Sequence, residues 1–213
     1  MRQVWVVCFE ELRKAFRSPG TYALLGLFYM VTAVLYFSVF TQASGQAQRY
    51  SPLQMVWELQ WLPTIFWVPL ITMRMLATER RLGLLESALS TPTTPAALVV
   101  GKYFAAFTIY CTGWLSIGLY MLITWLSGFG QNELSYIFNA TAIWGGVIFC
   151  LTSGILFLAL GLWCSSLTRN SIIAGALTVC LLLLYMLLPA ILRITEADSW
   201  SFLRPFYHLE NLS

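Results

Sequence analysis

The residues best suited to chemistry lie in one short charged segment, 73–102, set between two long apolar runs. This segment carries both signs of charge, in Arg74, Glu79, Arg80, Arg81, Glu86 and Lys102. From Tyr103 to Thr168 the only charged residue is Glu133. Charge gathered so tightly beside apolar segments indicates a membrane protein that presents a docking surface to the cytoplasm.

The residue patterns of catalytic, nucleotide and metal sites are missing from the sequence. It contains no GxxxxGK[ST] phosphate loop, no HExxH and no GxSxG motif. The sole histidine is His208, which we interpret as a surface or interface residue, and the five cysteines form no CxxC pair. We therefore expect a chain that is not an enzyme, does not hydrolyse ATP itself and holds no catalytic, cofactor or metal site.

Composition places the chain in a membrane. Hydrophobic residues make up 59% of the 213 residues and charged residues 10%, whereas a soluble domain carries about 25% charge. The apolar runs do not alternate with polar residues, so they predict helices rather than barrel strands. A bilayer core needs about 20 helical residues per crossing. Five runs are long enough, at about 21–41, 59–77, 99–126, 140–163 and 171–191.

The N-terminal residues have the pattern of an amphipathic helix. Apolar residues recur at helical spacing over residues 2–17, while charged residues occupy the other side. We expect residues 1–20 to form an interfacial segment along the membrane surface, separate from a transmembrane domain over 21–213. The alternative is a helix packed on protein instead of lipid. The predicted membrane-facing residues are Trp5, Phe9, Leu12 and Phe16.

The distribution of basic residues predicts the orientation. With the N-terminus in the cytoplasm, nine basic residues lie inside and only Arg49, Arg193 and Arg204 lie outside. The same orientation places the loop before residue 95 in the cytoplasm and the segment 193–213 outside. The net charge of +3 is too small to indicate nucleic-acid binding.

The cytoplasmic loop has the signals of a short helix between two spans. Thr78 can cap a helix that begins at Glu79 and stops at Ser90, since Pro92 and Pro95 follow. Thr94 then caps a new helix with Pro95 at its first position. The loop helix would carry three leucines on one face, which fits either a partner groove or packing on the chain's own neighbours. Those leucines are Leu82, Leu85 and Leu89.

This loop resembles that of ABC-2 type transporter permeases, in the stretch RMLATERRLGLLESALSTPTTPAALVVGKYFAAF. The matching motif comprises Glu79, Arg80, Arg81, Gly83, Glu86, Pro92, Thr93, Gly101 and Lys102. The N-terminal FEELRKAFRSPGTYALLGLF and the tail RPFYHLENLS are similar to a subgroup that includes gliding-motility and nitrous-oxide-reductase maturation permeases. The resemblance implies that residues 79–91 form a coupling helix that docks on an ATPase subunit. Its docking residues would be Glu79, Arg80, Arg81, Leu82, Leu85, Glu86 and Leu89.

The resemblance also implies a function and partners. The chain would be the permease subunit of an ATP-binding cassette transporter in the bacterial inner membrane, with ATP and magnesium bound by the partner ATPase. It would pair with a second copy or a homologous permease, contact membrane lipid, and leave room for an extracytoplasmic accessory subunit. The family has six spans, so we expect the sequence to be incomplete after the fifth. The alternatives are a non-transporting scaffold and a secondary carrier, the latter disfavoured by spans with almost no charge.

Overall fold

The computed structural model of the chain is helical and has no strand in the residues it describes, which are 2–43, 52–73, 75–77, 79, 94–127 and 140–194. Four helices are long and apolar enough to cross a membrane, over Pro19–Thr41, Pro95–Leu126, Ala140–Leu167 and Ser171–Leu188. The predicted all-α membrane fold is therefore confirmed. In chain order the helices are α1 (Arg2–Arg17), α2 (Pro19–Ala43), α3 (Pro52–Leu59), α4 (Trp61–Thr72), α7 (Pro95–Leu126), α9 (Ala140–Leu167) and α10 (Ser171–Ile194).

The predicted second span, 59–77, differs from what forms. Two helices, α3 and α4, meet at Gln60, and α4 has only 12 residues. Pro63 explains the break, because proline has no N–H to donate to the carbonyl of the residue four positions earlier and its ring crowds that carbonyl. Directly after the break the Gln60 carbonyl accepts from both the Thr64 N–H, at 3.4 Å, and the Thr64 hydroxyl, at 2.8 Å. A continuous helix over 59–77 is thus corrected to a broken pair over 52–72.

The second long helix, α7, begins four residues earlier than the span predicted at 99. The Thr94 side chain accepts a hydrogen bond from the Ala97 N–H at 3.3 Å, and Pro95 occupies the first turn. This is the cap that the sequence predicted. Because the helix begins at this cap, Lys102 lies inside the helix, near its start.

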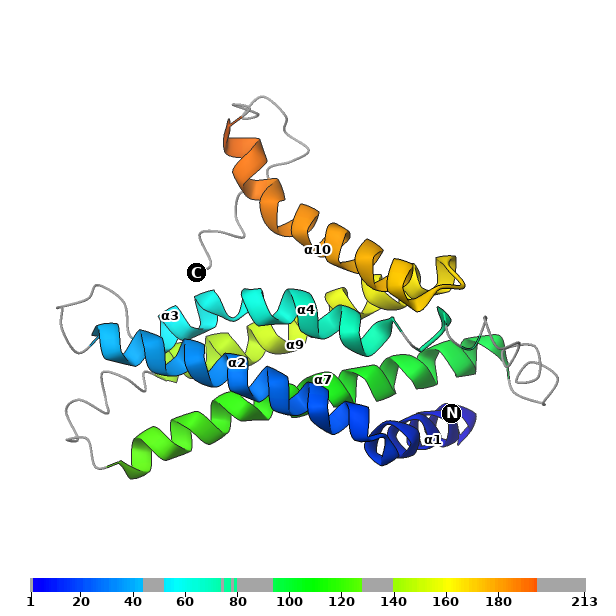
Figure 1. The fold of residues 1–213 in the computed structure, drawn as a ribbon, viewed down its shortest axis with the longest axis horizontal. Coiled ribbons are helices and arrows are strands. Elements are labelled where there is room, and N and C mark those ends of the chain that lie inside the picture. Colours follow the sequence, from blue (N-terminus) through cyan, green and yellow to red (C-terminus); the bar gives the residue numbers. More distant parts are fainter. Residues whose placement is uncertain are drawn as a thin grey trace.

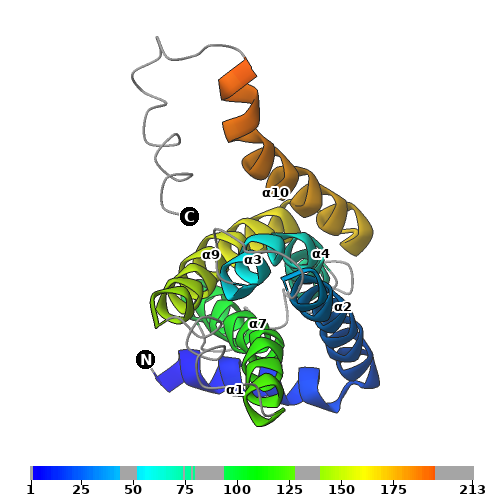
Figure 2. The same ribbon diagram turned by 90° about the vertical axis from the view of Figure 1, so that its left-hand side faces the viewer.

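The helices form a bundle with one helix across its end. Figures 1 and 2 show α2, α4, α7 and α9 side by side, and α1 lying across the bundle at the end where α2 and α7 begin. The helix α10 starts at this same end, beside α9, and then diverges from the bundle along its length (Figure 1). In both views α1 crosses the long helices at this end instead of continuing the direction of α2.

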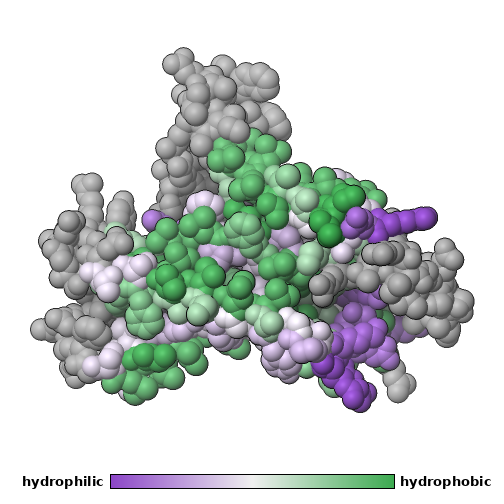
Figure 3. Space-filling view, viewed as in Figure 1, coloured by the Kyte–Doolittle hydropathy of each residue, from purple (hydrophilic) through white to green (hydrophobic). Residues whose placement is uncertain are grey.

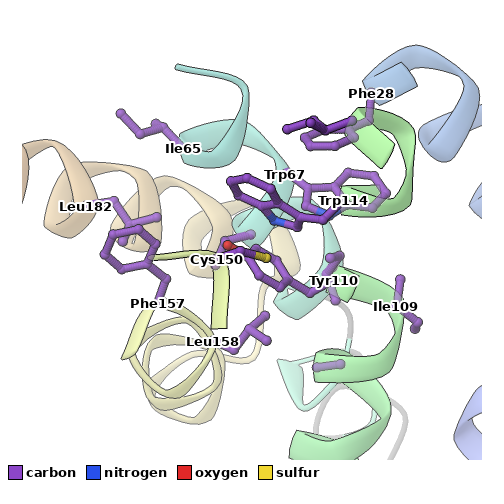
Figure 4. Close-up of a cluster of buried hydrophobic side chains, with 14 residues drawn as sticks. Phe28, Ile65, Trp67, Ile109, Tyr110, Trp114, Cys150, Phe157, Leu158 and Leu182 are labelled. Atoms are coloured by element: carbon purple, nitrogen blue, oxygen red, sulfur yellow. The ribbon is translucent and has the colours of Figure 1, made fainter. Parts of the chain in front are cut away.

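The core of the bundle is built around α4. Trp67 and Val68 are buried there among residues of α2, α7, α9 and α10. Figure 4 shows Trp67 beside Phe28 within this cluster. Two glycines of α9 allow large rings to pack against its backbone. A Cβ on Gly146 would overlap the Trp57 ring, and one on Gly154 would lie 2.5 Å from the Tyr110 ring. Glycine at these two positions therefore sets how closely α9 approaches α3 and α7.

Charge is concentrated at one end of the bundle. Figure 3 shows hydrophilic surface gathered where α1 lies and where α9 meets α10, with a hydrophobic middle. We call this the charged end; it comprises α1, Glu79, Lys102 and Arg169. At the opposite end, Glu58 is the one charged residue whose side chain the structure describes. A hydrophobic band between polar ends is the pattern of a chain that crosses a bilayer.

Candidate functional site at the base of the charged loop

The sequence places the docking residues in the loop between α4 and α7, and the structure describes the base of that loop. Glu79 is the one predicted docking residue among the described residues. The others, Arg80, Arg81, Leu82, Leu85, Glu86 and Leu89, lie outside them. The described part of the site consists of the residues that hold the base of the loop to the bundle.

Lys102 is the centre of this site. It lies near the start of α7 and is only 1% exposed, although lysine is rarely buried unless it is paired. Its ammonium donates to Glu79 Oε1 at 2.6 Å and to Glu11 Oε1 at 3.1 Å. One buried cation thus joins three parts of the chain, namely α7, α1 and the first residues of the charged loop.

A second lysine completes the charge balance. Lys14 lies one turn after Glu11 on α1 and donates to its Oε1 at 3.2 Å. Burial lowers the pKa of Lys14, but the charge and hydrogen bond of Glu11, with the charges of Glu79 and Glu10, raise this pKa by more. Two ammonium groups therefore face two carboxylates, Glu11 and Glu79. We call these four residues the ion cluster.

Gly101 explains how α1 comes close enough for the ion cluster to form. A Cβ on this glycine would lie 2.8 Å from the Val7 side chain and 3.0 Å from the Val4 carbonyl oxygen. Any larger residue would push α1 away from α7. The Gly-Lys pair therefore combines two roles, since Gly101 allows the close contact and Lys102 forms the ion pair across it.

The start of the loop is also held by α9. The buried Ser165 hydroxyl accepts hydrogen bonds from the backbone N–H groups of Leu76, at 3.3 Å, and Ala77, at 3.1 Å. One helical turn earlier, a Cβ on Gly161 would lie 2.5 Å from the Thr72 hydroxyl, so α9 and the end of α4 pack closely. The residues that lead into the loop are thus fixed to α9, while Glu79 is fixed to α7 and α1.

The predicted membrane face of α1 is partly open. Trp5 and Phe9 are 71% and 72% exposed, while Leu12 and Phe16 are half-buried. The opposite side of α1, with Cys8 and Glu11, packs against α7. One face of α1 thus packs on the bundle, while contact of the open face with lipid stays a prediction. The Trp5 ring stacks on Phe104 of α7, with centroids 6.5 Å apart, so the outer faces of the two helices are continuous.

The described part of the site consists of ion pairs and hydrogen bonds that connect the loop base to α7, α1 and α9. Among the described residues no group of three or more His, Cys, Asp or Glu side chains is placed to hold a metal ion. The ion cluster offers instead a charge-assisted connection from a loop to two helices, which is strong and directional when shielded from water. Lys102 is the shared partner of Glu79 and Glu11 in this connection.

Sequence reasoning did not assign roles to Glu11 and Ser165, and it included Lys102 only as a motif residue. A signal for Lys102 was present, since it is the one charged residue within the 32 residues of α7. Ser165 gave no such signal, because serine and other small residues recur throughout α9. Its role depends on the neighbouring loop, which sequence spacing does not reveal.

Comparison with known families agrees with this architecture. The family described as ABC-2 family transporter protein matches residues 59–211, which is most of the chain and runs from α3 to beyond α10. A comparison with curated proteins finds no match. The matched residues include most of the apolar spans, the charged loop, Lys102 and Ser165. The chain therefore belongs to the ABC-2 transporter family and is the membrane component of an ABC transporter.

Proposed function

We propose that this chain is the permease subunit that couples ATP hydrolysis by a separate ATPase to substrate movement across the membrane. The observation that carries the proposal is the buried Lys102, which ties the first residues of the charged loop to α7 and α1. A loop that only connected two spans would gain little from a buried ion pair, since desolvating the charges costs as much as their attraction returns. A loop that must transmit force gains a stiff connection.

The proposed mechanism follows from this geometry. ATP and magnesium bind to the partner subunit, whose closure displaces residues 79–91, with the leucine face in a groove of the ATPase. Glu79 then pulls on Lys102, so that α7 and α1 move together. Docking must favour one bundle arrangement over the other, because a partner that binds both equally shifts nothing. The charged end faces the cytoplasm in this proposal, supported by the nine-to-three distribution of basic residues.

The complete transporter in this proposal contains two permease and two ATPase subunits in a bacterial inner membrane. The second permease is another copy or a homologue, and the sequence similarity favours the gliding-motility and nitrous-oxide-reductase maturation subgroup. Exposed apolar side chains on α2 and α10 offer surface for such a contact, among them Met30, Val34, Ile172 and Leu184.

The test separates docking from coupling. The chain is co-expressed with its ATPase, and two variants are compared with the wild type, namely a deletion of residues 82–89 and Lys102→Met. We expect the deletion to abolish co-purification of the ATPase, whereas Lys102→Met should retain it but lose transport-coupled ATP turnover. Unchanged association after the deletion would contradict the docking assignment. Normal coupling in a folded Lys102→Met protein would contradict the role of the ion cluster, and a complex without any substrate-dependent turnover would indicate a scaffold.

A further inference from the structure

The outer face of α1 contains a shallow depression with a basic rim. It has a volume of about 390 Å³ and is lined by Phe9, Leu12, Arg13 and Phe16. Three of these side chains are apolar, and they follow the helical spacing that places them on one face. Arg13 stands at the boundary between this apolar face and the polar side of α1. An apolar surface beside a cation suits an amphiphile, whose hydrocarbon chain would lie on the apolar side chains while its anionic group met the cation.

The cations of α1 fall into two groups. Lys14 is engaged with Glu11 in the ion cluster. Arg13 and Arg17 lie one turn apart and, among the residues that the structure describes, neither has a carboxylate within ion-pair distance. Both remain exposed. The acidic residues of the charged end are therefore used internally, while these two guanidinium groups are available to an anion from outside the chain.

The depression lies beside the start of the first candidate span, where the headgroups of a surrounding bilayer are expected. Only Ser18 separates α1 from α2, and the candidate span begins at Pro19. Phe16 also contacts Tyr22 of α2, with ring centroids 6.5 Å apart, so the depression is held against the start of the span. An arginine at this depth extends its apolar stem along the hydrocarbon and places its guanidinium among the phosphates.

We propose that this depression binds an anionic phospholipid of the surrounding membrane. One acyl chain lies against Phe9, Leu12 and Phe16, and the phosphate is held by Arg13, with Arg17 adding to the attraction for a net negative headgroup. Guanidinium groups bind phosphate through two parallel hydrogen bonds, which makes Arg13 better suited than a lysine to hold the headgroup in place. This proposal stands on the membrane location of the chain and does not depend on coupling to an ATPase.

Native mass spectrometry of the purified full chain tests the proposal. The protein in detergent is titrated with phosphatidylglycerol or with phosphatidylcholine of the same acyl chains, and the bound lipids are counted. We expect preferential retention of phosphatidylglycerol. Arg13→Gln should weaken it about fivefold, the factor expected for one basic residue near an anionic membrane surface. Arg13→Lys should recover much of the loss, because it keeps the charge.

A matched control is available at the same end of the bundle. Arg169 is exposed in the short turn between α9 and α10 but does not line the depression. Arg169→Gln removes the same charge and should leave phosphatidylglycerol retention unchanged. Circular dichroism and thermal unfolding confirm that each variant is folded. Equal retention of the two lipids by the wild type, no effect of Arg13→Gln, or an equal loss with Arg169→Gln would each overturn the proposal.

Discussion

The two ends of the bundle are held together by different interactions. At the charged end, helices α1 and α7 and the base of the loop meet through buried charges. At the opposite end, α2, α3 and α7 meet through a neutral cluster of Tyr36, Val39, Val56 and Tyr120. There the Tyr36 hydroxyl lies 2.9 Å from the Thr124 hydroxyl, and the Tyr120 hydroxyl donates to the Tyr29 carbonyl at 2.6 Å.

The difference indicates where a buried ion pair is useful despite the free energy needed to remove its charges from water. Aromatic packing with neutral hydrogen bonds stabilises a fixed arrangement without desolvating any charge. A buried ion pair adds little net stability over an apolar contact, yet breaking one partner is costly, so it makes its members move together. This device is found beside the loop that we propose to dock on an ATPase. The following predictions test whether the two ends differ in this way.

The largest effect is expected from Lys102→Met. The substitution leaves the Glu11 and Glu79 carboxylates close together without their shared cation and should lower the free energy of unfolding by about 3–5 kcal/mol. Unfolding in detergent micelles measures this loss. Adding Glu11→Gln and Glu79→Gln should recover most of it, because no buried charge then remains unpaired and the exposed Lys14 stays solvated. Lys14→Met is the matched control, since that lysine is 66% exposed and its removal should cost less than about 1 kcal/mol. An equal cost for both lysines would contradict the central role of Lys102.

A smaller effect is expected from Ser165→Ala. The change removes the acceptor of the Leu76 and Ala77 N–H groups and should lower the free energy of unfolding by about 1–3 kcal/mol. It should also increase hydrogen exchange at these two amides. Thr152→Ala serves as control on the same helix, because that exposed hydroxyl donates only to carbonyls of α9 itself. Unchanged exchange at Leu76 and Ala77 would show that α9 does not hold the loop.

At the opposite end the expected effect is smaller again. Tyr36→Phe removes a neutral hydrogen bond to Thr124 while keeping the ring in its cluster, so we expect a loss of about 0.5–1.5 kcal/mol. The loss should not depend on salt concentration. Tyr22→Phe, at an exposed position of the same helix, should have almost no effect. If Tyr36→Phe proved as costly as Lys102→Met, the two ends would not differ in the way described here.

The smallest effect concerns pH. The pKa of Lys14 lies above its ordinary value of 10.5, because its attraction to Glu11 outweighs its burial. A raised pKa in the folded state means that the contribution of Lys14 to stability is complete below the unfolded pKa and is lost as pH rises through the folded pKa. Thermal unfolding of the wild type and Lys14→Gln should therefore differ by a constant amount near neutral pH and converge as the pH rises beyond the ordinary pKa of 10.5 and through the raised folded pKa. A difference that grows with rising pH would contradict this.

Much of the fold could be predicted because its signals are local. The boundaries of α1, the cap at Thr94 and the long apolar helices follow from the spacing and type of neighbouring residues. The break between α3 and α4 was missed for a physical reason. The run from Leu59 onward is apolar throughout, and hydropathy does not distinguish a continuous span from one in which Pro63 removes a backbone donor.

The candidate site could be predicted only in part, because it depends on distant residues. Glu11 and Lys102 are separated by 91 positions and Glu79 and Lys102 by 23, so no helical or strand periodicity connects them. The sequence identifies Gly101 and Lys102 as part of a motif. Their roles follow only from the packing of α1 against α7. The leucine face of residues 82–89 lies outside the described residues and stays a prediction.

The divergence of α10 has a mechanical consequence. Its first half is anchored by Ala174, Thr178 and Leu182, whereas from Leu183 to Leu188 none of its side chains is buried. The helix is about 36 Å long at 1.5 Å per residue. It still contacts the bundle at Tyr185, whose ring lies 5.8 Å from that of Phe157 on α9, measured between centroids. If the half that packs against α4 and α9 tilted, the residues beyond Met186 would therefore move furthest.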